Sequence, residues 1–150
     1  MITIRTSQRK IAVDTAALKK TAQQLLTMLN YADFDLGIWL TTNKTIKKYN
    51  HLYRKKNAPT DILSFPFYPE LKAGHRIKPH CDDDKNLGDI LISLEYAQKD
   101  AQKQGISLKK HMQVLLVHGI CHLLGYDHIK NSDYIIMHAQ EQKLLSQINK

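Results

Sequence analysis

Three histidines near the C-terminal end of the chain, His118, His122 and His128, have the residue type and spacing of a metal site. Residues four positions apart lie on one face of an α-helix with Cβ atoms about 5 to 6 Å apart, so His118 and His122 can reach the same ion. Gly125 predicts the end of that helix, because glycine adopts the left-handed backbone conformation at little steric cost. The chain can then turn back and bring His128 to the same ion.

Three nitrogen ligands leave the fourth position of a tetrahedral zinc ion open to water, which is typical of catalytic rather than structural zinc. We therefore expect one Zn²⁺ per chain and hydrolytic chemistry, although imidazole also suits nickel, copper and iron. The spacing His-x3-His-x2-Gly-x2-His is also that of the metzincin proteases, in which a glutamate follows the first histidine as general base. That position is Gly119 here, so a proteolytic mechanism lacks its proton acceptor.

Other residues around the three histidines allow more than one role. Cys121 flanks the predicted ligand face and offers a conceivable fourth ligand, but we favour a core thiol because free cysteine commonly behaves as a small buried hydrophobic residue. His111 lies about 10 Å along the helix from His118, which favours a role in solvent or in support of a ligand over direct ligation. Asp127 can either orient an imidazole or cap the turn.

Composition bounds the size of the fold and the class of partner. The chain has 150 residues and carries 22 Lys and Arg against 14 Asp and Glu, a formal net charge of +8. This length fits one domain, residues 1–150, whose core is large enough to fold without the ion. The charge favours a polyanion, with nucleic acid as the first candidate, although a merely basic protein has the same composition.

Cysteine use and hydropathy predict the cellular compartment. Cys81 and Cys121 make no disulfide framework and suit a reducing compartment, for which the cytoplasm is the default. Residues 1–10 carry charges where a signal peptide needs an apolar run, and no segment approaches the about 20 apolar residues of a membrane span. We expect a cytoplasmic protein that does not cross a membrane, and the sequence does not predict its oligomeric state.

Periodic patterns predict the elements that position the site. Alternating or continuous apolar residues indicate strands over 2–4, 36–40, 62–65 and 87–93. Helices are expected to begin after capping residues, which are Asp14, Thr42, Ser93, Ser107 and Ser132. The polar stretch from Tyr68 to Asn86 has neither period and is expected to form a long loop.

These elements predict an α/β (α+β) fold, with a mixed sheet of about four strands packed with helices and the zinc helix near the C-terminus. The short helix after Thr42 is expected to deliver residues 53–56 to a loop. The last helix is expected to bury an apolar side that includes Ile135, Ile136 and Leu144.

The motif His118-Gly-x-x-His122-Leu-x-Gly-Tyr-Asp-His128 resembles that of the YbeY endoribonucleases, also called ribosomal RNA maturation factors. The similarity continues through most of the chain, at Tyr53-Arg54, residues 59–66, residues 87–93, Met137 and Glu141. It implies a zincin-like fold and a zinc-dependent, single-strand-specific endoribonuclease that acts in ribosomal RNA processing, including small-subunit rRNA 3′-end maturation, and in ribosome quality control. The implied partners are single-stranded RNA, ribosomal RNA and the ribosome or its small subunit.

The resemblance also implies which residues carry the activity. It assigns the zinc ligands to His118, His122 and His128 and a catalytic role to Arg54. From the residues alone, Arg54 is one cation of a basic segment; its planar fork, if it acts, suits two phosphate oxygens and the charge that develops on phosphorus. The chain departs from the family at Cys121, where leucine is usual.

Two alternatives to RNA hydrolysis remain open from the sequence. A zinc metalloprotease-like hydrolase is supported by the metzincin spacing and opposed by Gly119. A non-enzymatic RNA- or ribosome-binding factor, with a metal that only braces the fold, is supported by the net charge of +8.

Overall fold

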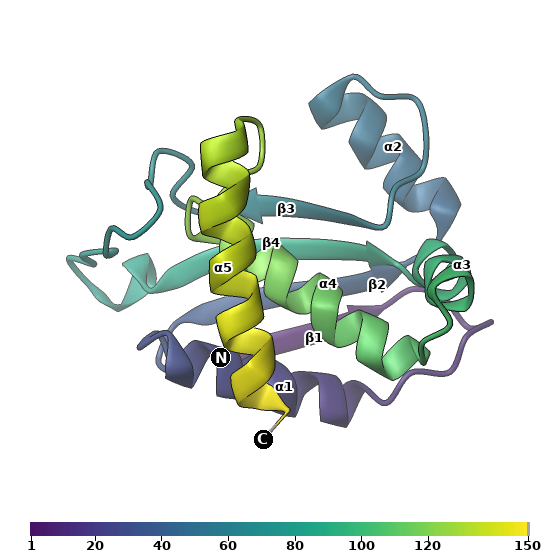
Figure 1. Ribbon diagram of the computed structural model, residues 1–150, viewed down its shortest axis with the longest axis horizontal. Coiled ribbons are helices and arrows are strands. Elements are labelled where there is room, and N and C mark those ends of the chain that lie inside the picture. Colours follow the sequence, from purple (N-terminus) through teal and green to yellow (C-terminus); the bar gives the residue numbers. More distant parts are fainter. Residues whose placement is uncertain (150) are drawn as a thin grey trace.

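The computed structural model describes residues 1–149, in which a mixed sheet is covered by helices (Figure 1). The elements in chain order are β1 (Ile2–Thr6), α1 (Thr15–Met28), β2 (Asp35–Thr41), α2 (Asn43–Arg54), β3 (Ile62–Pro66), the 3-10 helix η1 (Asp82–Asp84), β4 (Asn86–Ser93), α3 (Leu94–Gln104), α4 (Leu108–Leu123) and α5 (Asn131–Ile148). The sheet has four strands in the order β1-β2-β4-β3. β1, β2 and β4 are parallel and the edge strand β3 is antiparallel. The predicted mixed sheet of about four strands is confirmed.

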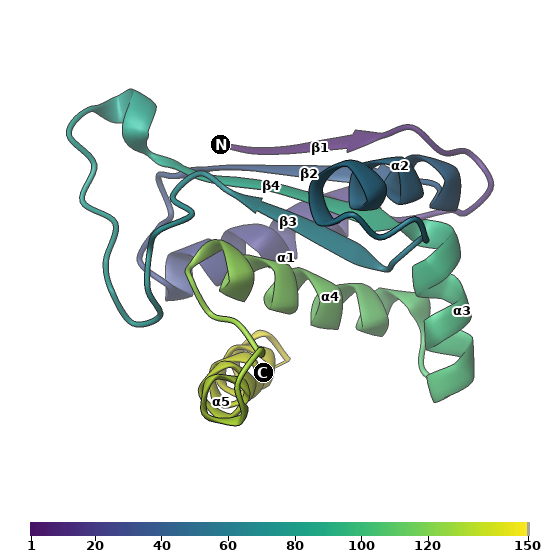
Figure 2. The same cartoon turned by 90° about the horizontal axis from the view of Figure 1, so that it is seen from above.

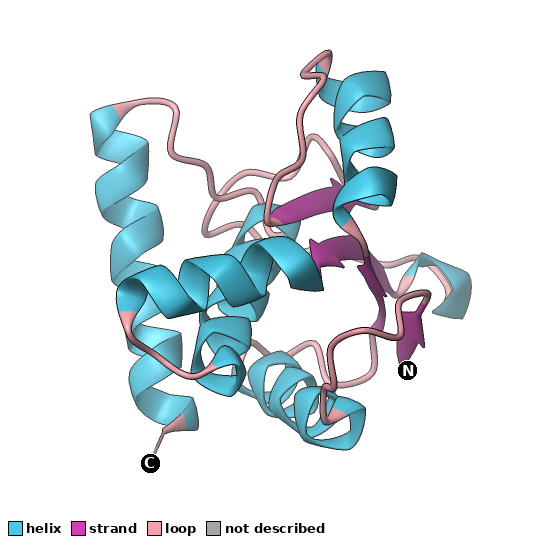
Figure 3. Ribbon diagram, turned by 90° about the vertical axis from the view of Figure 1, so that its right-hand side faces the viewer, coloured by secondary structure: helices cyan, strands magenta, loops and turns pink. Residues whose placement is uncertain are grey.

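Most of the helices lie on one face of the sheet (Figures 2 and 3). α1 and α4 pack on the strands, and α5 packs on α4 and α1 as a third layer. Alternate residues of β2 and β4 point into this core, where Ile38 and Ile90 belong to the same buried cluster as Leu116 and Ile120. Among the described residues, no helix has both the length and the apolar content needed to cross a membrane.

The other face of the sheet is covered only at one end, by α2. Ile46 of α2 packs there on Leu63 of β3 and Leu91 of β4 in a small separate cluster. These two strand residues alternate with the neighbours that face the main core, as the two-residue period of a strand requires. The sheet therefore has one fully covered face and one partly open face.

Local capping sets the beginnings of four helices as predicted. A side-chain oxygen of the residue before each helix accepts a hydrogen bond from a backbone N–H of the first turn, and these residues are Asp14, Thr42, Ser93 and Ser107. The prediction for Ser132 is wrong, since α5 begins at Asn131 and the preceding Lys130 makes no side-chain cap. A serine before an apolar helical segment is typical of an N-cap, but here the helix already begins at Asn131, one residue before Ser132.

Two further expectations are corrected by the structure. α2 runs through Arg54 and ends at Lys55 (φ 56°), so Tyr53 and Arg54 lie on its last turn rather than in a loop. Ile135 and Ile136 of α5 are 65% and 54% exposed. Because α5 packs on the outer side of α4 and α1, a narrow stripe through Met137 and Leu144 suffices to bury its inner side.

The polar segment between β3 and β4 is mainly irregular, as predicted, although it includes η1 and ends at Lys85, because Asn86 already belongs to β4. It is tied to the end of α1 by Arg76, which donates to the carbonyl oxygens of Leu29 and Asn30 at 2.9 and 3.0 Å. The acidic run is largely solvated, with the Asp82 side chain 98% exposed beside Lys85.

Gly119 allows α4 to lie close to the sheet. A Cβ atom at this position would be 2.9 Å from the Cδ1 atoms of both Ile62 and Ile90, and the Ser64 hydroxyl donates to the Gly119 carbonyl oxygen at 3.4 Å. The position that carries a glutamate in metzincins thus faces the sheet in this chain, and a long side chain has no room there.

We predict that Gly119→Leu lowers the free energy of unfolding by about 1 to 3 kcal/mol, because the added side chain overpacks the contact between α4 and the sheet. Urea denaturation followed by circular dichroism measures this change. Lys109→Leu, at an exposed position of the same helix, is the control and should change stability by less than about 0.5 kcal/mol. Equal midpoints for the two variants would contradict the assigned packing.

Candidate metal centre

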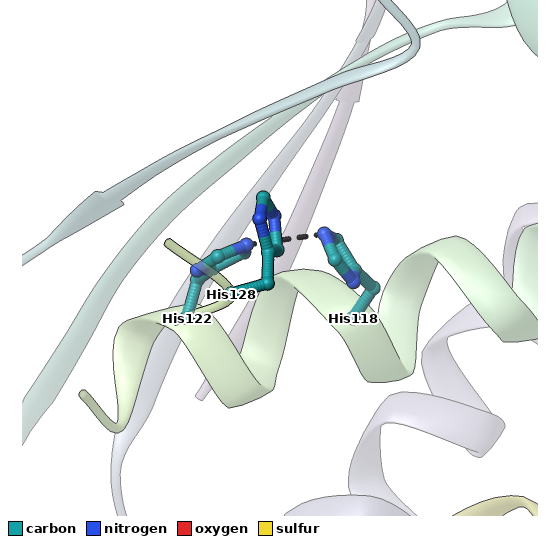
Figure 4. A group of neighbouring side chains, drawn as sticks. All are labelled: His118, His122 and His128. Carbon is teal, nitrogen blue, oxygen red and sulfur yellow. Dashed lines mark hydrogen bonds between the residues drawn. The ribbon is translucent and has the colours of Figure 1, made fainter. Parts of the chain in front are cut away.

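The structure brings the three predicted histidines together (Figure 4). His118 and His122 project from α4, and His128 reaches them from the segment between α4 and α5. One ring nitrogen from each lies within 4.8 Å of the others, and the Nε2 atoms of His118 and His122 are 3.1 Å apart. Nitrogen ligands about 2.1 Å from a tetrahedral ion are about 3.4 Å from one another. The trio therefore has nearly the spacing that a metal ion requires.

The turn that returns His128 to α4 is built on Gly125. Gly125 has φ +92° and donates its N–H to the His122 carbonyl oxygen, and Tyr126 donates to that of Cys121, both at 3.1 Å. This pair of bonds is the Schellman arrangement that ends a helix. A Cβ atom on Gly125 would also lie 2.3 Å from the Leu71 carbonyl oxygen, so glycine is required by both the backbone angle and the neighbouring loop.

Hydrogen bonds on the far side of each ring orient the two α4 imidazoles. His122 Nδ1 lies 2.9 Å from the Tyr126 carbonyl oxygen, and His118 Nδ1 lies 2.8 Å from Glu141 Oε2 on α5. A carbonyl oxygen and a carboxylate accept hydrogen bonds, so each Nδ1 carries the hydrogen and each Nε2 of a neutral ring keeps its lone pair. His118 and Glu141 are 23 positions apart, and no periodic pattern in the sequence predicts their contact.

The two Nε2 lone pairs therefore point at one another across 3.1 Å. Two acceptors at this distance repel unless a positive centre lies between them, and either a shared proton or a metal ion meets that need. Burial, followed by the neighbouring His118 and His128, lowers the pKa of His122 to about 4. His122 thus stays a neutral imidazole, the form that binds metals, far below neutral pH.

The trio lies in a cleft of about 1180 Å³. Its walls come from β3, the segment after it, the turn that follows α4, and the ends of α2 and α5. Arg54, at the end of α2, lines this cleft together with His118, His122 and His128. Arg54, the catalytic cation that the family resemblance assigns, therefore shares a cavity with the metal site, although it lies 64 positions before His118 in the sequence.

Three other residues that the sequence placed near the site do not join the histidine trio. Cys121 is fully buried in the core, and burial, followed by the charge of Glu141, raises the pKa of its thiol to about 12, so it stays protonated. His111 is only 4% exposed, and neither ring nitrogen has a partner among the described residues, so the expected solvent or supporting role is wrong. Asp127 accepts from the backbone N–H of Ile129 at 3.3 Å and caps the turn.

Comparison with known proteins gives consistent matches over the whole chain. A family model described as Endoribonuclease YbeY matches residues 3–149. The human Endoribonuclease YbeY is 37% identical over 149 residues, covering 99% of this chain and 89% of the human protein. That of Aquifex aeolicus is 36% identical over 132 residues, covering 88% and 80%. A solution structure from Thermotoga maritima has the same fold, with a TM-score of 0.66 and 22% identity over 99% of this chain and 89% of that one.

We predict that Glu141→Ala weakens metal binding by about 10- to 100-fold, because the His118 ring loses the acceptor that fixes its orientation. Competition with a chromophoric zinc chelator measures the affinity. Gln142→Ala, at the next and exposed position of α5, is the control and should bind metal normally. Unchanged affinity in Glu141→Ala, with the far-UV spectrum intact in both variants, would contradict the assigned role of Glu141.

Proposed function

Because the chain belongs to the YbeY endoribonuclease family, we propose that it is a zinc-dependent endoribonuclease that hydrolyses phosphodiester bonds of single-stranded RNA. The observation that carries this proposal is the convergence of three imidazoles and Arg54 in one cleft. In the proposal His118, His122 and His128 hold one ion per chain. α4 is then the zinc helix of a zincin-like fold, within a single catalytic domain of residues 1–150.

In the proposal, the bound ion and the residues of the cleft have different chemical roles. Zn²⁺, when bound, supplies a water of lowered pKa and a positive charge beside the scissile phosphate. Glu141 and the Tyr126 carbonyl oxygen hold the ligand rings in the tautomer that leaves Nε2 free. Arg54 presents two parallel N–H donors to phosphate oxygens, and these donors stabilise the negative charge that builds on the phosphoryl group in the transition state.

The biological substrate that we propose is ribosomal RNA. Processing of the small-subunit rRNA 3′ end, ribosome quality control and contact with the ribosome or its small subunit are the roles that family membership suggests. The net charge of +8 suits such polyanionic partners. Cys81 and Cys121 are both free, which suits our assignment to the reducing cytoplasm.

The metalloprotease alternative loses support from the fold. A general-base glutamate at position 119 would have to fit against Ile62 and Ile90, where a single Cβ atom already makes contacts of 2.9 Å. The cleft thus has no carboxylate in the place where the metzincin mechanism needs one. The non-enzymatic alternative is still supported by the basic net charge. The His122→Ala experiment below distinguishes it from the catalytic proposal.

We predict that His122→Ala lowers bound zinc sharply and slows cleavage of single-stranded RNA by at least about 100-fold, while the chain stays folded. Elemental analysis, cleavage of a labelled RNA and circular dichroism on the same preparations measure the three properties. His75→Ala, in the exposed loop, is the control and should retain both metal and activity. The magnitude follows from loss of the water activation that the ion provides. Cleavage that survives in His122→Ala would indicate a contaminating nuclease and favour the non-enzymatic alternative.

We also predict that Arg54→Lys binds RNA nearly normally but cleaves it about 100-fold more slowly, because lysine keeps the charge and loses the two-pronged donor. Single-turnover cleavage with saturating enzyme isolates this step from binding. Lys56→Ala, which removes a neighbouring exposed cation, should weaken binding in a salt-dependent manner without slowing the saturated rate. A rate for Arg54→Lys within about threefold of wild type would remove Arg54 from the catalytic step.

A further inference from the structure

The partly open face of the sheet forms a groove of about 670 Å³ beside α2. Its floor consists of strand residues that alternate with core residues, and neighbouring strands place them in register, with Arg5 opposite Trp39 and Gly37 opposite Asp89. The missing side chain at Gly37 makes room for the Asp89 carboxylate, which lies over this position on the floor of the groove. The groove is therefore a surface feature that the strand pattern creates on the face of the sheet opposite the main core.

A row of aromatic side chains runs along this groove. The rings of Trp39 and Tyr49 meet edge to face with centroids 5.6 Å apart, and those of Tyr53 and Phe65 meet edge to face at 5.2 Å. Between these pairs, Tyr49 and Tyr53 have parallel planes with centroids 6.2 Å apart. Tyr53 is 61% exposed although it belongs to this row. Exposed aromatic faces such as that of Tyr53 are surfaces on which unpaired nucleobases stack.

The aromatic row is continuous with the metal cleft. Tyr53 and Phe65 line both cavities, and Arg54 of the cleft follows Tyr53 directly in α2. β3, which carries Phe65, is the edge strand of the sheet. An extended chain that leaves the cleft across β3 therefore meets Phe65 and Tyr53 first and Trp39 last.

The charges around the groove suit a nucleic-acid strand with its bases turned inward. The Arg5 guanidinium covers one face of the Trp39 ring, 4.2 Å from its centre, and presents its own outer planar surface for stacking. The helix that carries Tyr49 and Tyr53, together with the turn after it, also carries exposed cations that can bind phosphates, and these are Lys44, Lys47, Lys48, Lys55 and Lys56. Inside the groove, Asp35 and Asp89 repel phosphate but can accept hydrogen bonds from base amino groups.

From these observations we infer that the groove is a second RNA subsite, in which unpaired bases of the strand extending from the metal cleft stack on the aromatic row. This inference rests on the proposed function, because it takes the occupant of the cleft to be single-stranded RNA. It adds that the enzyme holds RNA on the open face of the sheet, at a distance from the scissile bond. Continuity with the cleft and the cations of α2 and the turn after it favour RNA over a protein segment as occupant.

Trp39 makes the inference directly measurable, because it is the only tryptophan of the chain. Titration of wild-type protein with a single-stranded RNA of twelve nucleotides, in chelator to prevent cleavage, should quench Trp39 fluorescence in a saturable manner. A trinucleotide, which can fill only the cleft, and a duplex of the same length, whose bases are already stacked, should not quench it. Absence of saturable quenching by the twelve-nucleotide strand overturns the inference.

Variants separate stacking from a structural effect of the side chain. Trp39→Leu should weaken binding of the twelve-nucleotide RNA, measured by fluorescence polarisation, by about 5- to 150-fold, the effect of one stacked base. Trp39→Phe should restore most of the affinity, and trinucleotide binding should be unchanged in both. Tyr134→Ala, at an exposed aromatic position outside both cavities, is the control and should bind like wild type.

The same variants distinguish failure of this inference from failure of the proposed function. If wild-type protein cleaves RNA while Trp39→Leu and Trp39→Phe bind the long RNA equally, the catalytic proposal stands and the groove belongs to a protein partner instead. If RNA quenches Trp39 but the zinc-loaded protein never cleaves it, the subsite stands and the proposed activity is wrong. Urea denaturation of each variant shows whether the fold is retained.

Discussion

The close contact between α4 and the sheet determines the geometry of the site. With no side chain at Gly119, the helix lies against Ile62 and Ile90, and His118 and His122 are held at the level of β3. A wider separation would lift both imidazoles away from the cleft wall to which β3 contributes. The same helix carries α5 on its outer side, so its position also decides whether Glu141 can reach His118.

Half-buried imidazoles need hydrogen-bond partners, and the partners of His118 and His122 leave the site suitable for a cation. Burial of a polar group without a hydrogen bond costs free energy. The Glu141 carboxylate and the Tyr126 carbonyl oxygen avoid this cost, because they accept hydrogen bonds from the Nδ1 atoms of His118 and His122. Both bonds consume the ring hydrogens and leave two lone pairs facing one another. The two hydrogen bonds that satisfy the Nδ1 atoms thus also leave the Nε2 atoms of His118 and His122 free to bind a positive ion.

The unequal coverage of the sheet gives the molecule two adjoining surfaces. Helices bury one face, while α2 covers only the end of the other and leaves the aromatic groove beside it. The last turn of α2 carries Tyr53 and Arg54 to the boundary between groove and cleft. A helix that ended one turn earlier, as a loop over residues 53–56 would require, would not hold these side chains in fixed positions.

The sequence by itself determined the features that arise within a few residues of one another. The pairing of His118 with His122, the turn at Gly125 and the caps at Asp14 and Ser107 all depend on hydrogen bonds and periods of at most one or two helical turns. The family resemblance, which extends from the histidine motif to Tyr53-Arg54 and other segments of the chain, added Arg54.

Only the tertiary structure decided the strand order, the contact of Glu141 with His118, the burial of His111 and the exposure of Ile135. Each of these depends on which surfaces meet after the chain has folded. An apolar or titratable residue has the same local preferences whether or not a distant element covers it, so its surroundings follow from packing and not from its neighbours in sequence.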